Sequence, residues 1–268
     1  MIIVTSIIAV LGMVFLPFVL GFWLTRKFNL PWRLWIAGAA TFILSQVGHI
    51  PALVGLTALF TNGVLPSPPA AWTTAFNAVT LGLMAGIFEE TARYVLFKFS
   101  LKNARTWNEG VLVGAGHGGI EAIFLGIGGI LTIVNMIVMR NLDASMLGLS
   151  ADQAALAKQQ VDAFWASPAY IGLLGLIERF FAVCLHVALS VMVLYSVAYK
   201  KPIWFWTALL WHAAVDAGSV YLSPMLGPLA TEGVVGGMAM VSALILFGLR
   251  PKFDVPNPPQ VMVEEAAA

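Results

Sequence analysis

The stretch "GIFEETARYVLF", residues 86 to 97, decides the fold class because it puts charges inside a segment that otherwise suits a membrane. Glu89, Glu90 and Arg93 lie within an apolar segment of about residues 72–98. Ionisable side chains in a membrane-spanning helix are costly and are functional by default. Helical spacing lets Arg93 pair with either glutamate, since it follows them by four and three residues. We therefore expect a membrane helix that carries a functional site.

The composition extends this expectation to the whole chain. Its 268 residues are 60% hydrophobic and only 10% charged, with a mean hydropathy of +0.89, whereas a soluble domain is about 25% charged. A span needs about 20 apolar residues. The fold expected is an all-α, polytopic membrane helix bundle in the cell membrane, with about seven transmembrane helices. The segments are 2–25, 34–60, 72–98, 108–139, 168–199, 203–222 and 226–249.

The basic residues predict the orientation of the bundle. Ten of the 14 Lys and Arg lie in four clusters, within residues 26–33, 98–105, 200–201 and 250–252. With seven spans, all four clusters lie on one side, which the positive-inside rule makes cytoplasmic. The N-terminus is then outside and the C-terminus cytoplasmic. We expect one transmembrane domain over residues 1–250 and a disordered cytoplasmic tail over 251–268, which is rich in proline.

The net charge, the single cysteine and one loop segment give three further expectations. The net charge of +1 gives no reason to expect a nucleic-acid partner. The single cysteine, Cys184, excludes a disulfide framework and a cysteine metal cluster. In the outer segment after residue 140, "SADQAALAKQQVDAF" (150–164) starts with a suitable N-cap serine and predicts a short surface helix.

Polar side chains recur inside four other predicted spans. Counted from the nearest basic residue, Glu89, His117, His186 and His212 lie 9 to 14 residues deep, which is about 13–21 Å at the helical rise. Antiparallel helices would scatter unrelated groups over the full thickness, so one shared site is the simpler interpretation. The residues expected to support it are Gln46, His49, Glu121, Glu178, Arg179, His186 and Asp216.

This set of residues suits hydrolysis. Two adjacent carboxylates resist joint ionisation, which favours a general base and acid. Catalytic zinc uses three protein ligands and an open position, and the candidate ligands are His117, His186, His212 and Glu90. Taken singly, each group also fits a structural role. Glu89, Glu90 and Arg93 fit an ion pair, His117 with Glu121 fits a helix-packing hydrogen bond, and His49 fits a contact to a carbonyl freed by Pro51.

"EETAR" resembles the E-E-x-x-R signature of the CAAX-protease and bacteriocin-processing superfamily and its PrsW-like relatives. The ordered set "SQVGHIP", "EETARY", "GAGHGGIEAI", "ERFFAVCLHVALSV" and "WHAAVDAG", spread over roughly residues 1–250, is most similar to the YhfC family of intramembrane endopeptidases. The resemblance implies that Glu89 and Glu90 are the catalytic pair and that Arg93 is their ion-pair partner. His117 and His212 fall on motif histidines, and Asp216 falls where relatives have Asn or Asp.

The expected protein is therefore an intramembrane endopeptidase that acts on a peptide or a membrane protein, with membrane lipid as its surroundings. Glu89 or Glu90 activates water, His117 positions that water or ligates zinc, and His212 ligates zinc or stabilises the oxyanion. The resemblance leaves open a zinc-dependent and a metal-free, glutamate-type mechanism. We expect the polar cavity to open nearer the cytoplasmic side. The alternatives are a cation or proton transporter or channel and a haem-binding protein with two histidine ligands.

Overall fold

The computed structural model describes residues 1–142, 148 and 150–253, and within them it is helical, with no strand. The prediction of an all-α bundle is confirmed. A 3₁₀ turn, η1 (Ala70–Trp72), precedes α3, and a π-helical turn, η2 (Leu96–Ser100), continues it. The helices are α1 (Ile2–Phe28), α2 (Arg33–Thr61), α3 (Thr73–Val95), α4 (Trp107–Asn141), α5 (Ala151–Ala166), α6 (Ile171–Ala198), α7 (Ile203–Leu226) and α8 (Pro228–Phe253).

Six segments of the described chain are long and apolar enough to cross a membrane: α1, α2, residues 70–100 around α3, α4, α6 and α8. The sixth predicted span, 203–222, forms the 24-residue helix α7 but is not among them. Its tryptophans, with His212 and Asp216, lower its hydropathy. Its length, about 36 Å, would still cross the apolar layer.

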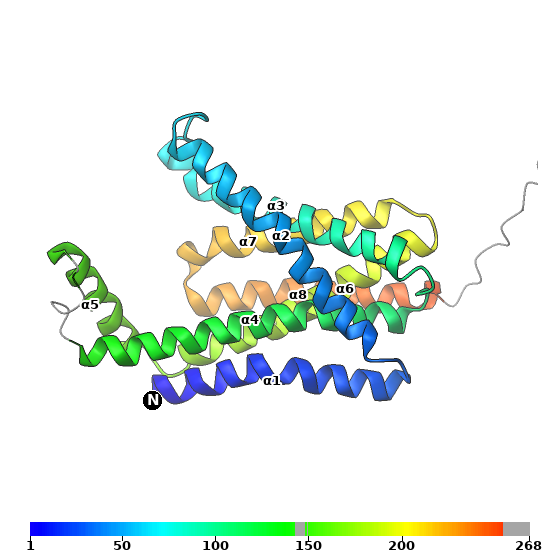
Figure 1. Ribbon diagram of the computed structural model, residues 1–268, viewed down its shortest axis with the longest axis horizontal. Helices are drawn as coiled ribbons and strands as arrows, with labels where there is room; N and C mark the ends of the chain where they lie inside the picture. Colours follow the sequence, from blue (N-terminus) through cyan, green and yellow to red (C-terminus); the bar gives the residue numbers. More distant parts are fainter. Residues whose placement is uncertain (143–147, 149, 254–268) are drawn as a thin grey trace, which may run out of the picture.

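Helices α1, α4, α7 and α8 run along one common direction, whereas α2 crosses them obliquely, and the chain turns at the two ends of the bundle (Figure 1). The connections from α1 to α2, from η2 to α4 and from α6 to α7 lie at one end, together with the end of α8. These four places carry the four basic clusters, so the clusters share an end, which we call the basic end. The start of the chain and α5 lie at the opposite end. The assignment of the basic end to the cytoplasm stays a prediction.

Two predictions concern segments outside the membrane spans: a surface helix that starts at residue 150 and a tail that starts at residue 251. The surface helix predicted from residue 150 is confirmed as α5, because Ser150 caps it and forms a capping box with Gln153. The predicted boundary at residue 250 falls inside α8, which continues to Phe253. The rest of that tail, 254–268, lies outside the described residues.

Glycines let the helices that carry the site approach closely. A Cβ at Gly116 of α4 would collide with the Trp35 carbonyl of α2, and one at Gly82 of α3 would collide with the Ala213 carbonyl of α7. Small residues at such crossings are typical of membrane helix packing. The backbones of α2 and α4, and of α3 and α7, are therefore close enough for short polar side chains to meet between them.

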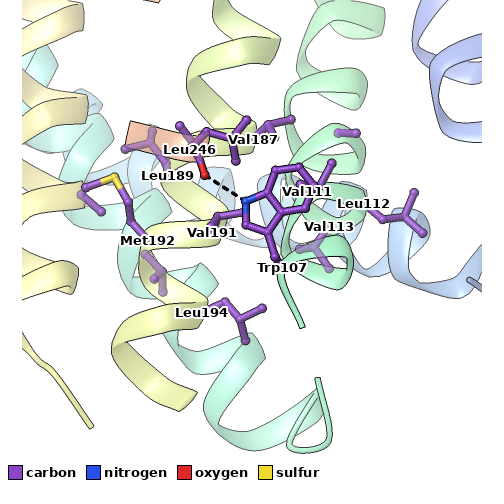
Figure 2. Close-up of a cluster of buried hydrophobic side chains, with 14 of the residues drawn as sticks. Trp107, Val111, Leu112, Val113, Val187, Leu189, Val191, Met192, Leu194 and Leu246 are labelled. Atoms are coloured by element: carbon purple, nitrogen blue, oxygen red, sulfur yellow. Dashed lines mark hydrogen bonds between the residues drawn. The ribbon is translucent and has the colours of Figure 1, made fainter. Parts of the chain in front are cut away.

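The basic end is filled by apolar side chains from α4, α6 and α8 (Figure 2). Trp107 donates its ring N–H to the Leu246 carbonyl at 2.9 Å, so its one polar atom is satisfied. On α6, every residue from Leu185 to Ser196 is buried. We call this cluster the basic-end core; it includes Trp107, Val111, Leu112, Leu189, Val191, Met192, Leu194 and Leu246.

Candidate active site

Six ionisable side chains from four helices meet in the middle of the bundle. Each is at most 5% exposed. Ion pairs and hydrogen bonds join the six into one cluster. They are Glu89, Glu90 and Arg93 of α3, His117 of α4, His186 of α6 and His212 of α7.

Glu90 and Arg93 form the base of the site. One oxygen of Glu90, Oε1, pairs with Arg93 and lies 2.7 Å from His212 Nδ1. Arg93 uses Nη1 for Glu90, and its second terminal nitrogen, Nη2, lies 2.7 Å from His186 Nδ1. A guanidinium only donates hydrogen bonds, so His186 Nδ1 is the acceptor. Arg93 thus ties α3 to α6, and Glu90 ties α3 to α7.

Glu89 has a different environment from its neighbour. Its Oε2 lies 3.0 Å from His117 Nε2 and 4.0 Å from His212 Nε2. Its Oε1 accepts a hydrogen bond from Gln46 Nε2 of α2 at 3.3 Å. Arg93 is further away, at 3.7 Å, than from Glu90. Side chains from three other helices therefore fix the position of this carboxylate.

A second chain of polar contacts joins α4 to α6. Glu121 Oε2 lies 2.5 Å from His186 Nε2, and Glu121 Oε1 accepts from Arg179 at 2.6 Å. Arg179 also pairs with Glu178. Because His186 Nδ1 accepts from Arg93, the proton of the neutral ring is on Nε2, the nitrogen next to the Glu121 carboxylate. Glu121 thus contacts α6 rather than its helix neighbour His117, and intrahelical spacing gave no sign of these cross-helix pairs.

A cavity of about 440 Å³ borders this cluster. Three members of the cluster, Glu89, His186 and His212, line it, whereas Glu90, Arg93 and His117 are not among its lining residues. The other predicted supporting residues all lie in its wall: Gln46, His49, Glu121, Glu178, Arg179 and Asp216. The two adjacent glutamates therefore differ, since only Glu89 reaches the cavity.

The cavity extends away from the basic end. On α6 its lining runs from His186 back to Glu178, and on α7 it runs from His212 on to Val220, which in both helices leads away from the basic clusters. The expectation of a cavity that opens nearer the basic, cytoplasmic side is therefore wrong. The depth of the polar residues along each helix does not show on which side of them the cavity lies.

His49 makes no contact of the predicted kind. Its ring stacks on Phe88 with 5.6 Å between centroids, and neither ring nitrogen has a hydrogen-bond partner among the described residues. The alternative of a hydrogen bond to a carbonyl freed by Pro51 is wrong, because no such bond forms. Its two buried, unpaired nitrogens belong to a side chain in the cavity wall.

Glu89, His186 and His212 form a group that fits a metal ion, because each offers a ligand atom and these atoms lie within 4.8 Å of one another. Imidazole nitrogen and carboxylate oxygen are the ligands of catalytic zinc. His212 is prepared for this role: its Nδ1–H donates to Glu90, so the lone pair of Nε2 is directed toward Glu89 and toward Asp216, 3.5 Å away. The two ring nitrogens of His186 already face Arg93 and Glu121. To bind a metal ion, His186 would have to give up one of these two contacts.

The predicted ligand set overlaps with this group. His186 and His212 belong to it, Glu89 takes the place proposed for Glu90, and His117 lies behind Glu89 at hydrogen-bond distance. Asp216, which follows His212 by one helical turn, extends the group on the cavity side.

A family model described as YhfC intramembrane metalloprotease matches residues 12–239 of the chain. The chain belongs to this family. Among curated proteins it is similar to the uncharacterized membrane protein YhfC of Bacillus subtilis (strain 168), with 31% identity over 239 residues, 87% of this chain and 89% of the relative. No solved structure matches it.

The region matched by the YhfC family contains the whole site, since the predicted site residues run from Gln46 to Asp216. It also includes α7, the predicted span that is not among the six apolar segments. The membership and the six apolar helices identify a multi-pass membrane protein. The resemblance inferred from the motifs is confirmed.

Proposed function

We propose that the chain is an endopeptidase that hydrolyses a peptide bond in or near the membrane, and that the reaction takes place in the polar cavity. The observation that carries the proposal is the buried carboxylate of Glu89, which borders the cavity beside two imidazoles. The chain's membership of the YhfC intramembrane metalloprotease family supports the same reaction class.

Glu89 is the residue to which we assign the water. Its Oε1 accepts a hydrogen bond from Gln46, and its Oε2 lies at hydrogen-bond distance from His117 Nε2 and 4.0 Å from His212 Nε2. A carboxylate in this position accepts a proton from water as the water attacks the scissile carbonyl. It then returns the proton to the leaving amine.

Glu90 and Arg93 are positioning residues in this scheme. Glu90 holds the Nδ1–H tautomer of His212, and Arg93 holds the opposite tautomer of His186. A divalent metal ion would be held by Glu89, His186 and His212, and would supply a Lewis acid that polarises the carbonyl or the water; Glu89 would then serve as its ligand in place of acting as the free base. Asp216 Oδ2 lies 3.5 Å from His212 Nε2 on the cavity side and is a further candidate ligand for such an ion.

A cleavage assay with purified protein tests the proposal. Wild type and the Glu89→Gln variant are reconstituted in liposomes with single-span model peptides, and the products are read by mass spectrometry. Asp162→Asn is the matched control, because Asp162 lies on exposed α5 and pairs only with Lys158 in the described structure. We expect defined cleavage by wild type and control and none by Glu89→Gln. Cleavage by all three, or by none, would contradict the proposal.

Elemental analysis on the same samples addresses the metal. About one zinc per chain in wild type, lost in His212→Ala, supports a metal-dependent reaction. Metal-free protein that still cleaves supports water activation by Glu89 alone. Cation uptake into the liposomes without cleavage would instead favour the transporter, and the basic-end core makes that outcome unexpected because apolar side chains occupy the second half of such a path.

A further inference from the structure

We infer that the scissile peptide reaches Glu89 from the end of the bundle opposite the basic clusters. By the positive-inside rule this is the non-cytoplasmic face of the membrane. The inference rests on the proposed function for the reaction and adds the class of substrate: a membrane-anchored peptide whose cleavage site lies in the outer half of the membrane or at its outer surface.

The first observation is that six helices agree on the direction. The lining residues closest to a basic cluster are Phe42, nine residues from Arg33, and Glu89, nine residues from Lys98. Every other lining residue lies deeper, as Phe124 and Leu125 do on α4 and Val235 does on α8. Since 9 residues of helix span about 13 Å, the cavity begins at the polar layer and extends only away from the basic end.

The second observation is the seal on the other side. Between His186 and the basic residue Lys200, α6 contributes Leu189, Met192 and Leu194, each with no exposed surface. These side chains pack with Trp107 and Leu246 in the basic-end core (Figure 2). Close-packed apolar interiors leave few voids as large as a water molecule. A peptide from the basic end would have to displace this core to reach Glu89.

The third observation is the shape of the opposite end. The second half of α2 has no buried residue after Ser45, and the first buried residue of α3 is Ala78. The hairpin of α2 and α3 turns away from α1 and α4 at this end of the bundle (Figure 1). The site is therefore covered on the basic side and least covered on the side of the α2–α3 hairpin.

The wall of the cavity indicates what kind of segment fits. Leu81, Phe124, Leu125 and Val220 border it and are each between 39% and 48% exposed. Apolar side chains at the mouth suit a substrate segment with apolar residues, while the polar groups at the bottom suit its backbone. A segment from the outer half of a transmembrane helix, or just beyond it, has this character.

Cysteine accessibility tests the direction without using activity. In a Cys184→Ala background, Ser219→Cys puts a thiol in the cavity wall with a nearly isosteric change. Asn103→Cys marks the basic end and Ser67→Cys marks the α2–α3 connection, both at exposed positions. Right-side-out and inside-out vesicles are treated with a small membrane-impermeant methanethiosulfonate reagent. Unreacted thiols are then counted by a gel shift with a polymer-linked maleimide after denaturation.

We expect Ser219→Cys to react in the same vesicles as Ser67→Cys and to be protected in those where Asn103→Cys reacts. Leu125→Cys, another lining position, on α4, repeats the test if Ser219→Cys does not fold. Ser190→Cys, fully buried on α6 between Leu189 and Val191 of the basic-end core, should react in neither. Reaction of the cavity cysteines from the Asn103 side, from both sides or from neither would overturn the inference. Since no cleavage is measured, failure here is separate from failure of the proposed function.

Discussion

The two adjacent glutamates should respond differently when each loses its charge. Glu90→Gln removes the closest negative partner of Arg93, a side chain with no exposed surface. Removing one partner of a buried ion pair costs about 3–5 kcal/mol. Glu89 Oε2 remains 3.7 Å from Arg93, which points to the lower end, about 3 kcal/mol. Glu89→Gln keeps the Glu90–Arg93 pair, weakens the longer contact of 3.7 Å to Arg93, and removes the proposed base.

These costs translate into measurable shifts. For a chain of roughly this size a loss of about 3 kcal/mol lowers Tm by about 6–12 °C. We expect that shift for Glu90→Gln, measured by thermal unfolding in mild detergent. Glu89→Gln should leave Tm close to that of wild type and lower the cleavage rate by about 10²–10⁴-fold, the usual contribution of a general base. Asp162→Asn serves again as the control.

The opposite pattern would refute this reasoning. If Glu89→Gln lowered Tm and Glu90→Gln did not, Arg93 would take its charge balance from Glu89 rather than from Glu90. If Glu89→Gln folded normally and cleaved at the wild-type rate, the assignment of the water to this carboxylate would be wrong, whatever Glu90→Gln did.

Three further results are expected. Glu121→Ala should weaken zinc binding about 10–100-fold because it removes the carboxylate next to His186 Nε2. Chelator competition measures the affinity, and an unchanged affinity would remove Glu121 from the site. Gly116→Ala should lower the free energy of unfolding by about 1–3 kcal/mol, because its Cβ collides with the α2 backbone. The control is Gly128→Ala, whose Cβ meets nothing within 4 Å and which should not destabilise the protein in the same thermal unfolding measurement. Ser150→Ala should weaken the first turn of α5 by about 1 kcal/mol, seen as faster hydrogen exchange at residues 151–154, and unchanged exchange would argue against the cap.

Hydropathy predicted most of the helices, and it worked because a span has to satisfy its backbone internally over about 20 residues. The seven segments correspond to α1–α4 and α6–α8. The boundaries that differed most are the ends of α7 and α8, where neither Pro224 nor Pro251 stops the helix. The number of membrane spans was least secure at α7. Its tryptophans, together with the site residues His212 and Asp216, lower the hydropathy of this helix.

The contacts of the site were only partly predictable. Spacing of three and four residues gave the pairs of Arg93 with both glutamates and of His212 with Asp216. Residue spacing could not predict the contact of Arg93 with His186 or that of Arg179 with Glu121. These contacts depend on how α3, α4 and α6 are rotated and how closely they approach. The side on which the cavity lies was inaccessible for the same reason. It depends on volumes packed between helices, which a count of residues along one helix does not contain.

The adjacency of Glu89 and Glu90 explains why one residue can anchor the site while the other faces its cavity. Successive residues on a helix differ by about 100° in direction, so two neighbouring carboxylates cannot share one environment. Glu90 points to Arg93 and to His212 Nδ1, where its charge is compensated and a ring tautomer is fixed. Glu89 points to the cavity and to the other nitrogen of the same ring. His212 therefore lies between the two carboxylates, so a change at Glu90 reaches the cavity through the orientation of His212 rather than by direct contact.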